Sequence, residues 1–210
     1  MVTTLATGAE MRVRGRGSAA VVCVNGGRAA PALGTWSASL EWLVTRLAET
    51  TPMRFAEVRY RVRSWRRLDA CIADARAALA AVDAERVVLL GFSMGGAVAI
   101  ACADDPRVER VVGLAPWIPD ALPVETMRGK RLRVLHGSLD RALPGIPGVS
   151  PALSRRGFER ALAAGARGDY TLIPGAAHAI ALRAPTGRPV PLPRAAAWLR
   201  LVADELGRAA

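Results

Sequence analysis

The chain has 210 residues and a mass of 22.2 kDa, and we expect residues 1–210 to form a single domain with its own core. Hydrophobic residues make up 51% and charged residues 22%, which excludes a largely disordered chain, and no apolar run is long enough to span a membrane. The net charge is +11, but aromatic residues are only 5% and the arginines are spread along the chain, so we expect neither nucleic acid nor membrane as a partner. The one tight group of cations contains Arg59, Arg61, Arg63, Arg66 and Arg67.

The cysteines and the N-terminus bear on the compartment. Cys23, Cys71 and Cys102 lie far apart in apolar stretches, which is typical of buried free thiols and does not suggest zinc or any other metal. The first residues lack the basic and then apolar regions of a secretory signal. We therefore expect a cytoplasmic protein.

Apolar runs of strand length alternate with longer segments of helical periodicity, which indicates an α/β protein. The predicted strands are residues 18–25, 53–60, 86–90, 108–115, 132–136 and 170–173, with a short edge strand at 11–13 as a seventh. The predicted helices are residues 37–49, 68–82, 97–103, 151–164 and 193–206. Right-handed crossovers place such helices on both faces, so we predict a doubly wound, mostly parallel sheet.

The sequence GFSMG at residues 91–95 matches the pattern G-x-S-x-G between a predicted strand and a predicted helix. In that context the glycines permit a sharp turn in which the Ser93 hydroxyl projects above the sheet. Ser93 is therefore the candidate nucleophile.

A serine hydroxyl is a weak nucleophile at neutral pH and needs a base. The chain has only two histidines, and His178 follows the last predicted strand, at the edge of the sheet where ligands bind. Asp140 follows the preceding strand, so the order Ser93, Asp140, His178 is that of a nucleophile-elbow triad. The second histidine, His136, precedes the acid and is expected to bind backbone near the acid loop.

Two other aspartates compete with Asp140 for the role of the acid. Asp120 follows an earlier strand and is the better rival, whereas Asp169 begins a strand and lies at the wrong end of the sheet.

The first strong strand ends in Asn25-Gly26-Gly27, where the glycines allow the backbone to approach a ligand closely. The Gly27 N–H, with the Met94 N–H that follows the serine, is placed to hold a developing oxyanion.

Together these motifs resemble the α/β-hydrolase family over nearly the whole chain. The resemblance rests on Asn25-Gly26-Gly27, on GFSMGG around Ser93, on HGSLD with Asp140 and on GAAH ending at His178. It implies Ser93 as nucleophile, Asp140 as acid, His178 as base, and Gly27 with Met94 as oxyanion hole. Family members usually have histidine where Asn25 stands.

Length adds to this interpretation. Residues 116–131, where a lid domain is usually inserted in this family, are too few for a multi-helix lid, so we expect a minimal, nearly lidless member with an open site. The expected substrate-binding residues are Trp36, Trp117, Arg28, Leu143 and Ile180, and Arg141 lies beside the acid.

The sequence thus predicts a serine hydrolase of a small or medium carboxylic ester or thioester that acts through an acyl-enzyme without a cofactor. An acyltransferase or cyclase that uses the same triad is an alternative, and a non-catalytic binding module is another. The expected partner is a small acyl substrate, and we expect a monomer or weak homodimer.

Overall fold

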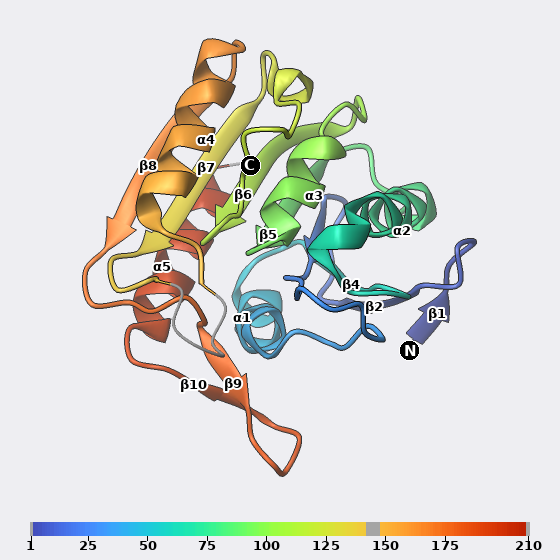
Figure 1. Cartoon of the computed structure of the whole chain (residues 1–210). Coiled ribbons are helices and arrows are strands. Elements are labelled where there is room, and N and C mark those ends of the chain that lie inside the picture. Colours follow the sequence, from blue (N-terminus) through green and yellow to red (C-terminus); the bar gives the residue numbers. More distant parts are fainter. Residues whose placement is uncertain (1, 142–147, 209–210) are drawn as a thin grey trace.

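One sheet of eight strands runs through the molecule in the computed structural model, which describes residues 2–141 and 148–208 (Figure 1). Its strand order is β1-β2-β4-β3-β5-β6-β7-β8. The strands are β1 (Val2–Thr4), β2 (Glu10–Arg14), β3 (Ala20–Val24), β4 (Arg54–Arg59), β5 (Val87–Phe92), β6 (Val108–Leu114), β7 (Arg131–Gly137) and β8 (Arg167–Ile173). All pairs from β4 through β8 are parallel, whereas β1 and β2 are antiparallel additions at one edge. The predicted mostly parallel sheet is confirmed.

The central strands are apolar because both of their faces are covered. Every residue of β3 is buried, as is nearly all of β5, and neither strand alternates apolar with polar residues. The parallel arrangement brings the carboxyl ends of β3 through β8 to one edge of the sheet. That edge holds the loops on which the candidate site residues lie.

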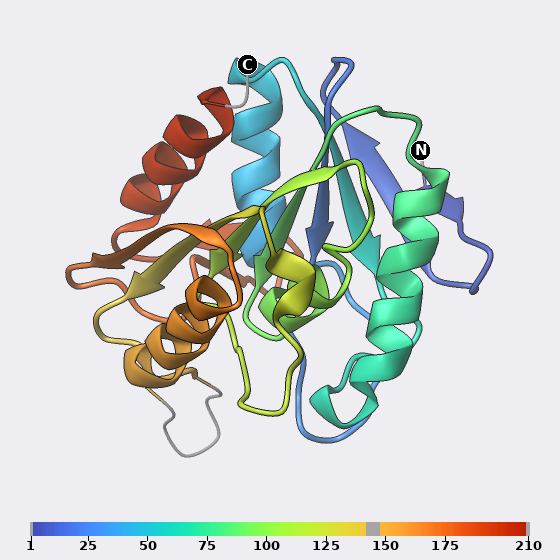
Figure 2. The ribbon, with the colours of Figure 1, turned by 90° about the horizontal axis from the view of Figure 1, so that it is seen from above.

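Helices cover both faces, as predicted for a doubly wound sheet (Figure 2). The five α-helices of the described chain are α1 (Ala38–Thr50), α2 (Leu68–Ala81), α3 (Gly95–Ala101), α4 (Pro151–Ala163) and α5 (Ala195–Gly207). Helices α1 and α5 pack on one face around Trp198 and Phe55, and α2, α3 and α4 pack on the other around Ile100 and Met127. Ser37 begins α1 by accepting a hydrogen bond from the Leu40 N–H.

Some elements differ from the sequence-based expectation. Strand β1 and a separate antiparallel hairpin, β9 (Ala181–Arg183) with β10 (Pro189–Pro191), were not predicted. Their three-residue strands carry too little apolar pattern to stand out. Helix α3 begins at Gly95, two residues earlier than expected, because the turn after β5 leads into it directly.

The connection between β6 and β7 is short. In the described chain it contains one 3-10 turn, η2 (Glu125–Met127), which agrees with the expected minimal lid. No helix among the described residues has the length and apolar character needed to cross a membrane.

Candidate active site

The chain turns sharply between β5 and α3, and Ser93 occupies that turn. Ser93 has a φ of 55°, a left-handed conformation that non-glycine residues seldom adopt. The neighbouring backbone is close: a Cβ on Gly95 would lie 2.2 Å from the Val24 carbonyl oxygen. The strained turn therefore depends on glycine beside the serine, which is the arrangement that the motif predicts.

His178 and Asp140 lie next to Ser93 at the carboxyl ends of the strands. His178 Nε2 is 3.0 Å from Ser93 Oγ, and His178 Nδ1 is 2.7 Å from Asp140 Oδ2. The Phe92 ring lies beside the imidazole, with ring centroids 5.2 Å apart. The structure thus brings together three side chains separated by up to 85 positions in sequence, in the order alcohol, imidazole, carboxylate.

Asp140 is buried and receives three polar contacts. Besides His178, the Val149 N–H donates to its Oδ1 at 3.0 Å, and His136 Nε2 lies 2.9 Å from its Oδ2. Burial alone would raise the pKa of this carboxyl, but the hydrogen bonds from His136 and His178 outweigh it and hold the pKa below its usual 3.8. The acid of the constellation is therefore kept ionised.

His136 does more than the sequence analysis expected. Its Nε2 is 2.9 Å from the Val149 carbonyl oxygen, the predicted kind of backbone contact, and equally close to the carboxylate of Asp140. Both neighbours are acceptors, so this nitrogen carries a proton. The ring is fully buried and stacks on Tyr170, with ring centroids 6.2 Å apart. His136 thus contacts the same carboxylate oxygen of Asp140 as His178 does.

The rival aspartates lie elsewhere. Asp120 is exposed and faces Arg156 and Arg160, and Asp169 pairs with Arg131 at the far end of the sheet. Neither contacts His178.

The loop after β3 approaches the serine closely. A Cβ on Gly26 would lie 3.0 Å from Ser93 Cβ, and one on Gly27 would lie 2.3 Å from Met94 Sδ. Asn25 accepts a hydrogen bond from the Gly26 N–H with its side-chain oxygen, and its side-chain amide donates to the Thr35 carbonyl oxygen. The Gly27 and Met94 N–H groups have no acceptor among the described residues.

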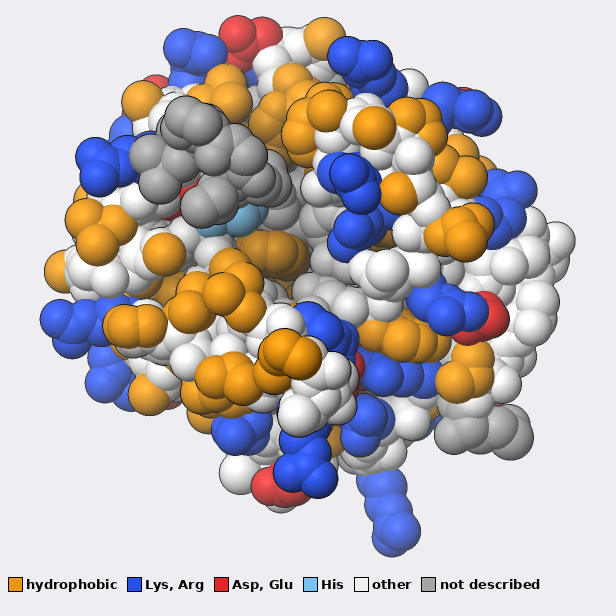
Figure 3. Space-filling view, turned by 60° about the horizontal axis from the view of Figure 1, so that its bottom comes forward, with side chains coloured by type: hydrophobic (Ala, Val, Ile, Leu, Met, Phe, Trp, Pro, Cys, Tyr) orange, Lys and Arg blue, Asp and Glu red, His pale blue; other side chains and the backbone are white. Residues whose placement is uncertain are grey.

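A cleft of about 1090 Å³ opens over these residues. Figure 3 shows the hollow, with hydrophobic side chains gathered on one side of it and basic side chains bordering the other. Its apolar lining includes Trp36, Phe92, Leu139, Leu182 and Leu192. Its charged lining consists, in the described chain, of Arg12, Arg59, Arg63, Arg141, Arg183 and Glu41.

Not every expected substrate-binding residue lies there. Trp36 and Arg141 line the cleft, but Arg28 is exposed outside its lining. Ile180 is fully buried in the core on the α1 and α5 face. Leu143 lies outside the described residues.

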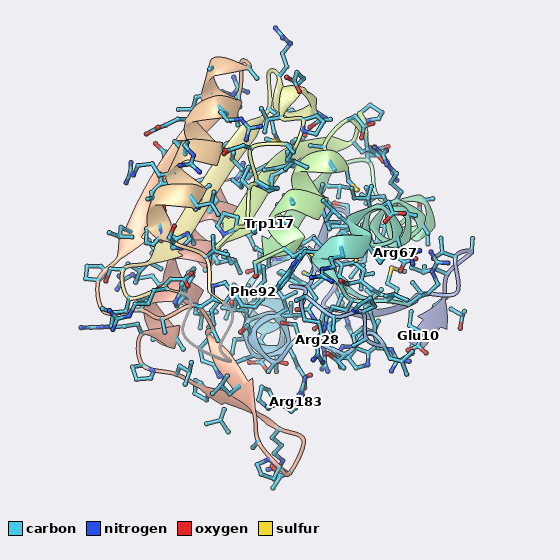
Figure 4. The ribbon with its side chains drawn as sticks, in the orientation of Figure 1. Glu10, Arg28, Arg67, Phe92, Trp117 and Arg183 are labelled. Carbon is cyan, nitrogen blue, oxygen red and sulfur yellow. The ribbon has the colours of Figure 1, made fainter. Side chains whose placement is uncertain are left out.

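Trp117 also requires a correction. It lines a second, separate cavity with residues of α2 and with the loop after β6. Trp117 packs against the core on the face covered by α2 and α3, and the chain reaches it through Ala115, which has a φ of 44°. Figure 4 shows Trp117 apart from Phe92, which lines the cleft.

Several lining residues of the cleft were not predicted from the sequence. Leu182 and Arg183 come from the hairpin of β9 and β10, and no pattern in the sequence indicates that this hairpin folds over the site. Arg63 did give a signal, because it belongs to the group of closely spaced arginines between β4 and α2.

Comparison with known families decides the classification. The model of the Alpha/beta hydrolase family matches residues 21–208. The chain belongs to this family. A comparison with curated protein sequences finds no match.

Solved structures of α/β hydrolases share the fold at low sequence identity. A sugar hydrolase from Lactococcus lactis aligns over 100% of this chain and 97% of its own, with 16% identity and a TM-score of 0.72. A monoacylglycerol lipase from Paleococcus ferrophilus aligns over 98% of both chains, with 14% identity and a TM-score of 0.68. An alpha-beta serine hydrolase homologue from Coxiella burnetii covers 100% of this α/β hydrolase and 95% of its own chain, with 14% identity and a TM-score of 0.68.

Proposed function

We propose that this α/β hydrolase is a serine hydrolase that cleaves a small or medium carboxylic ester or thioester. The observation that carries the proposal is the 3.0 Å contact between Ser93 Oγ and His178 Nε2, at a serine whose backbone is held in a left-handed conformation. A strained serine next to an imidazole costs stability, and folding alone gives no reason to retain it.

In the proposed first half-reaction, Ser93 Oγ attacks the substrate carbonyl and its proton passes to His178 Nε2. Asp140 accepts the hydrogen bond from His178 Nδ1–H and stabilises the imidazolium that forms. The carbonyl oxygen, now negative, receives hydrogen bonds from the Gly27 and Met94 N–H groups, which lack other acceptors in the described chain. The bond to the leaving oxygen or sulfur breaks, and His178 gives its proton to that atom.

Water completes the cycle. It attacks the acyl carbon and loses a proton to His178. The bond from the acyl carbon to Ser93 Oγ then breaks, the carboxylic acid product leaves, and His178 returns a proton to Ser93 Oγ. The open cleft and the short connection between β6 and β7 admit water, which favours hydrolysis over transfer of the acyl group to another acceptor.

The test combines a fluorophosphonate probe with short p-nitrophenyl esters. We expect labelling and turnover with the native chain, and neither with Ser93→Ala. The matched control is Ser18→Ala, because Ser18 is exposed before β3, at the opposite end of the sheet. Undiminished labelling of Ser93→Ala would place the nucleophile elsewhere. Labelling followed by transfer to an added amine or alcohol, without hydrolysis, would favour the acyltransferase alternative.

A further inference from the structure

The charged side of the cleft separates into paired and unpaired arginines. The paired ones are Arg12 with Glu41 and Glu57, Arg59 with Glu10, and Arg183 with Glu41. These ion pairs hold β2, β4, α1 and β9 together at the wall of the cleft. Arg63 and Arg141 line the cleft without a carboxylate partner in the described chain.

Arg63 is the better placed of the two. It is half-buried, and its guanidinium makes one hydrogen bond, from Nη1 to Thr35 Oγ1 at 2.9 Å. Its Nε is buried without a partner among the described residues. Residues 142–147 read ALPGIP and contain no acidic residue that would neutralise it. A guanidinium has five N–H donors, and only one of this group's donors has an acceptor on the described protein.

The backbone fixes Arg63 in this position. The Arg63 N–H donates to the Ala32 carbonyl oxygen at 2.8 Å, and the Trp65 N–H donates to that of Arg28 at 3.2 Å. The segment after β4 is thereby attached to the loop that follows Gly27. Burial and the neighbouring positive charge of Arg28 lower the pKa of Arg63. A cation that is half-buried beside another cation is electrostatically unfavourable until an anion binds.

The triad indicates which part of a substrate reaches Arg63. His178 must give a proton to the leaving group, so the leaving atom lies toward β8 and the acyl chain extends away from it. Arg63 follows β4, which lies two strands from β5 on the side opposite β8. Two strand spacings are about 10 Å, a distance that the long Arg63 side chain and an acyl chain of a few carbons span together.

We infer that Arg63 binds an anionic oxygen group at the far end of the acyl chain. The substrate class is therefore an ester or thioester of an acid that carries a second, anionic group, a carboxylate or a phosphate. A guanidinium suits both groups because its N–H donors match their oxygens. The inference rests on the proposed serine hydrolase activity and adds no covalent step to it.

The experiment compares matched substrates: the mono-p-nitrophenyl ester of adipate, the same ester with a terminal carboxamide, and an analogue with a terminal phosphonate. We expect kcat/KM for the carboxylate to exceed that for the carboxamide by roughly 10- to 100-fold, as for one charge-assisted hydrogen bond. The preference falls as sodium chloride is added. The phosphonate analogue shows which of the two anions is preferred.

Three variants test the assignment to Arg63. Arg63→Gln brings the ratio of the two kcat/KM values close to one, and Arg63→Lys, which keeps the charge without the planar fork, gives an intermediate ratio. The matched control is Arg66→Gln, because Arg66 belongs to the same group of arginines, is exposed and does not line the cleft. We expect it to leave both the ratio and the basal activity unchanged.

The outcomes separate the two proposals. A ratio near one in the native chain overturns the anionic substrate class while turnover still supports the hydrolase. An undiminished ratio in Arg63→Gln, or an equal loss in Arg66→Gln, overturns the role of Arg63. If Arg63→Gln does not fold, inhibition of the native chain decides: adipate should compete with the carboxamide ester more strongly than adipamide does. Absence of both turnover and fluorophosphonate labelling contradicts the proposed function itself.

Discussion

The two sides of the cleft are built on different principles. On the side of β5 to β8, Ser93, His178 and Asp140 form a chain of short hydrogen bonds, and the carboxylate is buried with each oxygen in contact with a donor. On the side of β2 to β4, the wall consists of Trp36 and long arginine side chains, of which Arg63 retains unused donors. A closed hydrogen-bond network suits a fixed proton transfer, whereas an open set of cations suits recognition of a variable part of the substrate.

The largest effect on activity should come from a substitution on the side of β5 to β8. Asp140→Asn leaves an amide N–H facing His178 and forces the imidazole into the tautomer whose Nε2 carries the proton, so Ser93 loses its base. We expect kcat to fall by about 10⁴-fold, measured by release of p-nitrophenol.

Asp120→Asn is the matched control, because Asp120 was the other candidate for the acid and lies exposed beside Arg156. Its kcat should equal that of the native chain. A loss in Asp120→Asn as large as in Asp140→Asn would contradict the assignment of the acid.

A smaller effect on the same side concerns His136, a positioning residue that contacts Asp140 and not the serine. His136→Leu removes one hydrogen bond to the carboxylate, and we expect kcat to fall about tenfold with KM nearly unchanged. His136→Gln keeps an N–H donor and should restore most of kcat. If both variants lose activity equally while their thermal unfolding is equally lowered, packing rather than the hydrogen bond explains the effect.

Trp36 tests the other side. The ring lines the cleft and stacks under Arg12, whose Cζ lies 4.4 Å from the ring centroid. Trp36→Ala removes apolar contact with the acyl chain, and we expect KM to rise about fivefold, equivalent to about 1 kcal/mol, with kcat nearly unchanged.

Trp117→Ala is its control, since Trp117 lines the separate cavity beside α2. Its KM should stay that of the native chain. A rise in KM for Trp117→Ala with none for Trp36→Ala would place the substrate against Trp117, the other tryptophan that was expected from the sequence to bind it.

The difference between the two sides also explains what the sequence made predictable. The fold follows from uninterrupted apolar strands such as β3, and the carboxyl ends of parallel strands necessarily meet at one edge. Ser93 follows β5 directly, and Asp140 and His178 lie in the loops that follow β7 and β8, so the order of elements was enough to predict that the three lie close together. That they act as a catalytic triad stays a prediction.

The binding side depends on details that periodicity does not contain. Trp117 packs on the face covered by α2 and α3 and lines the separate cavity there, a placement that periodicity does not indicate. Ile180 stands two positions from His178, yet its side chain enters the core. Arg61, two positions before Arg63, pairs with the buried Asp74, and which carboxylate meets which arginine is decided by tertiary packing.

The smallest expected effect concerns the thiols, which belong to neither side of the cleft. Cys23, Cys71 and Cys102 are all buried, and burial raises the pKa of Cys71 to about 11 and that of Cys102 to about 12. Since only the thiolate reacts, and it forms only as the pH rises toward these values, we expect the native chain to resist iodoacetamide at pH 8 and to keep its full esterase activity. Unfolding in denaturant should expose all three thiols to the reagent, a count that mass spectrometry gives directly. Rapid modification of the native chain with loss of ester turnover would mean that a cysteine reaches the cleft. The proposed division between a serine-based catalytic side and an arginine-based binding side would then be incomplete.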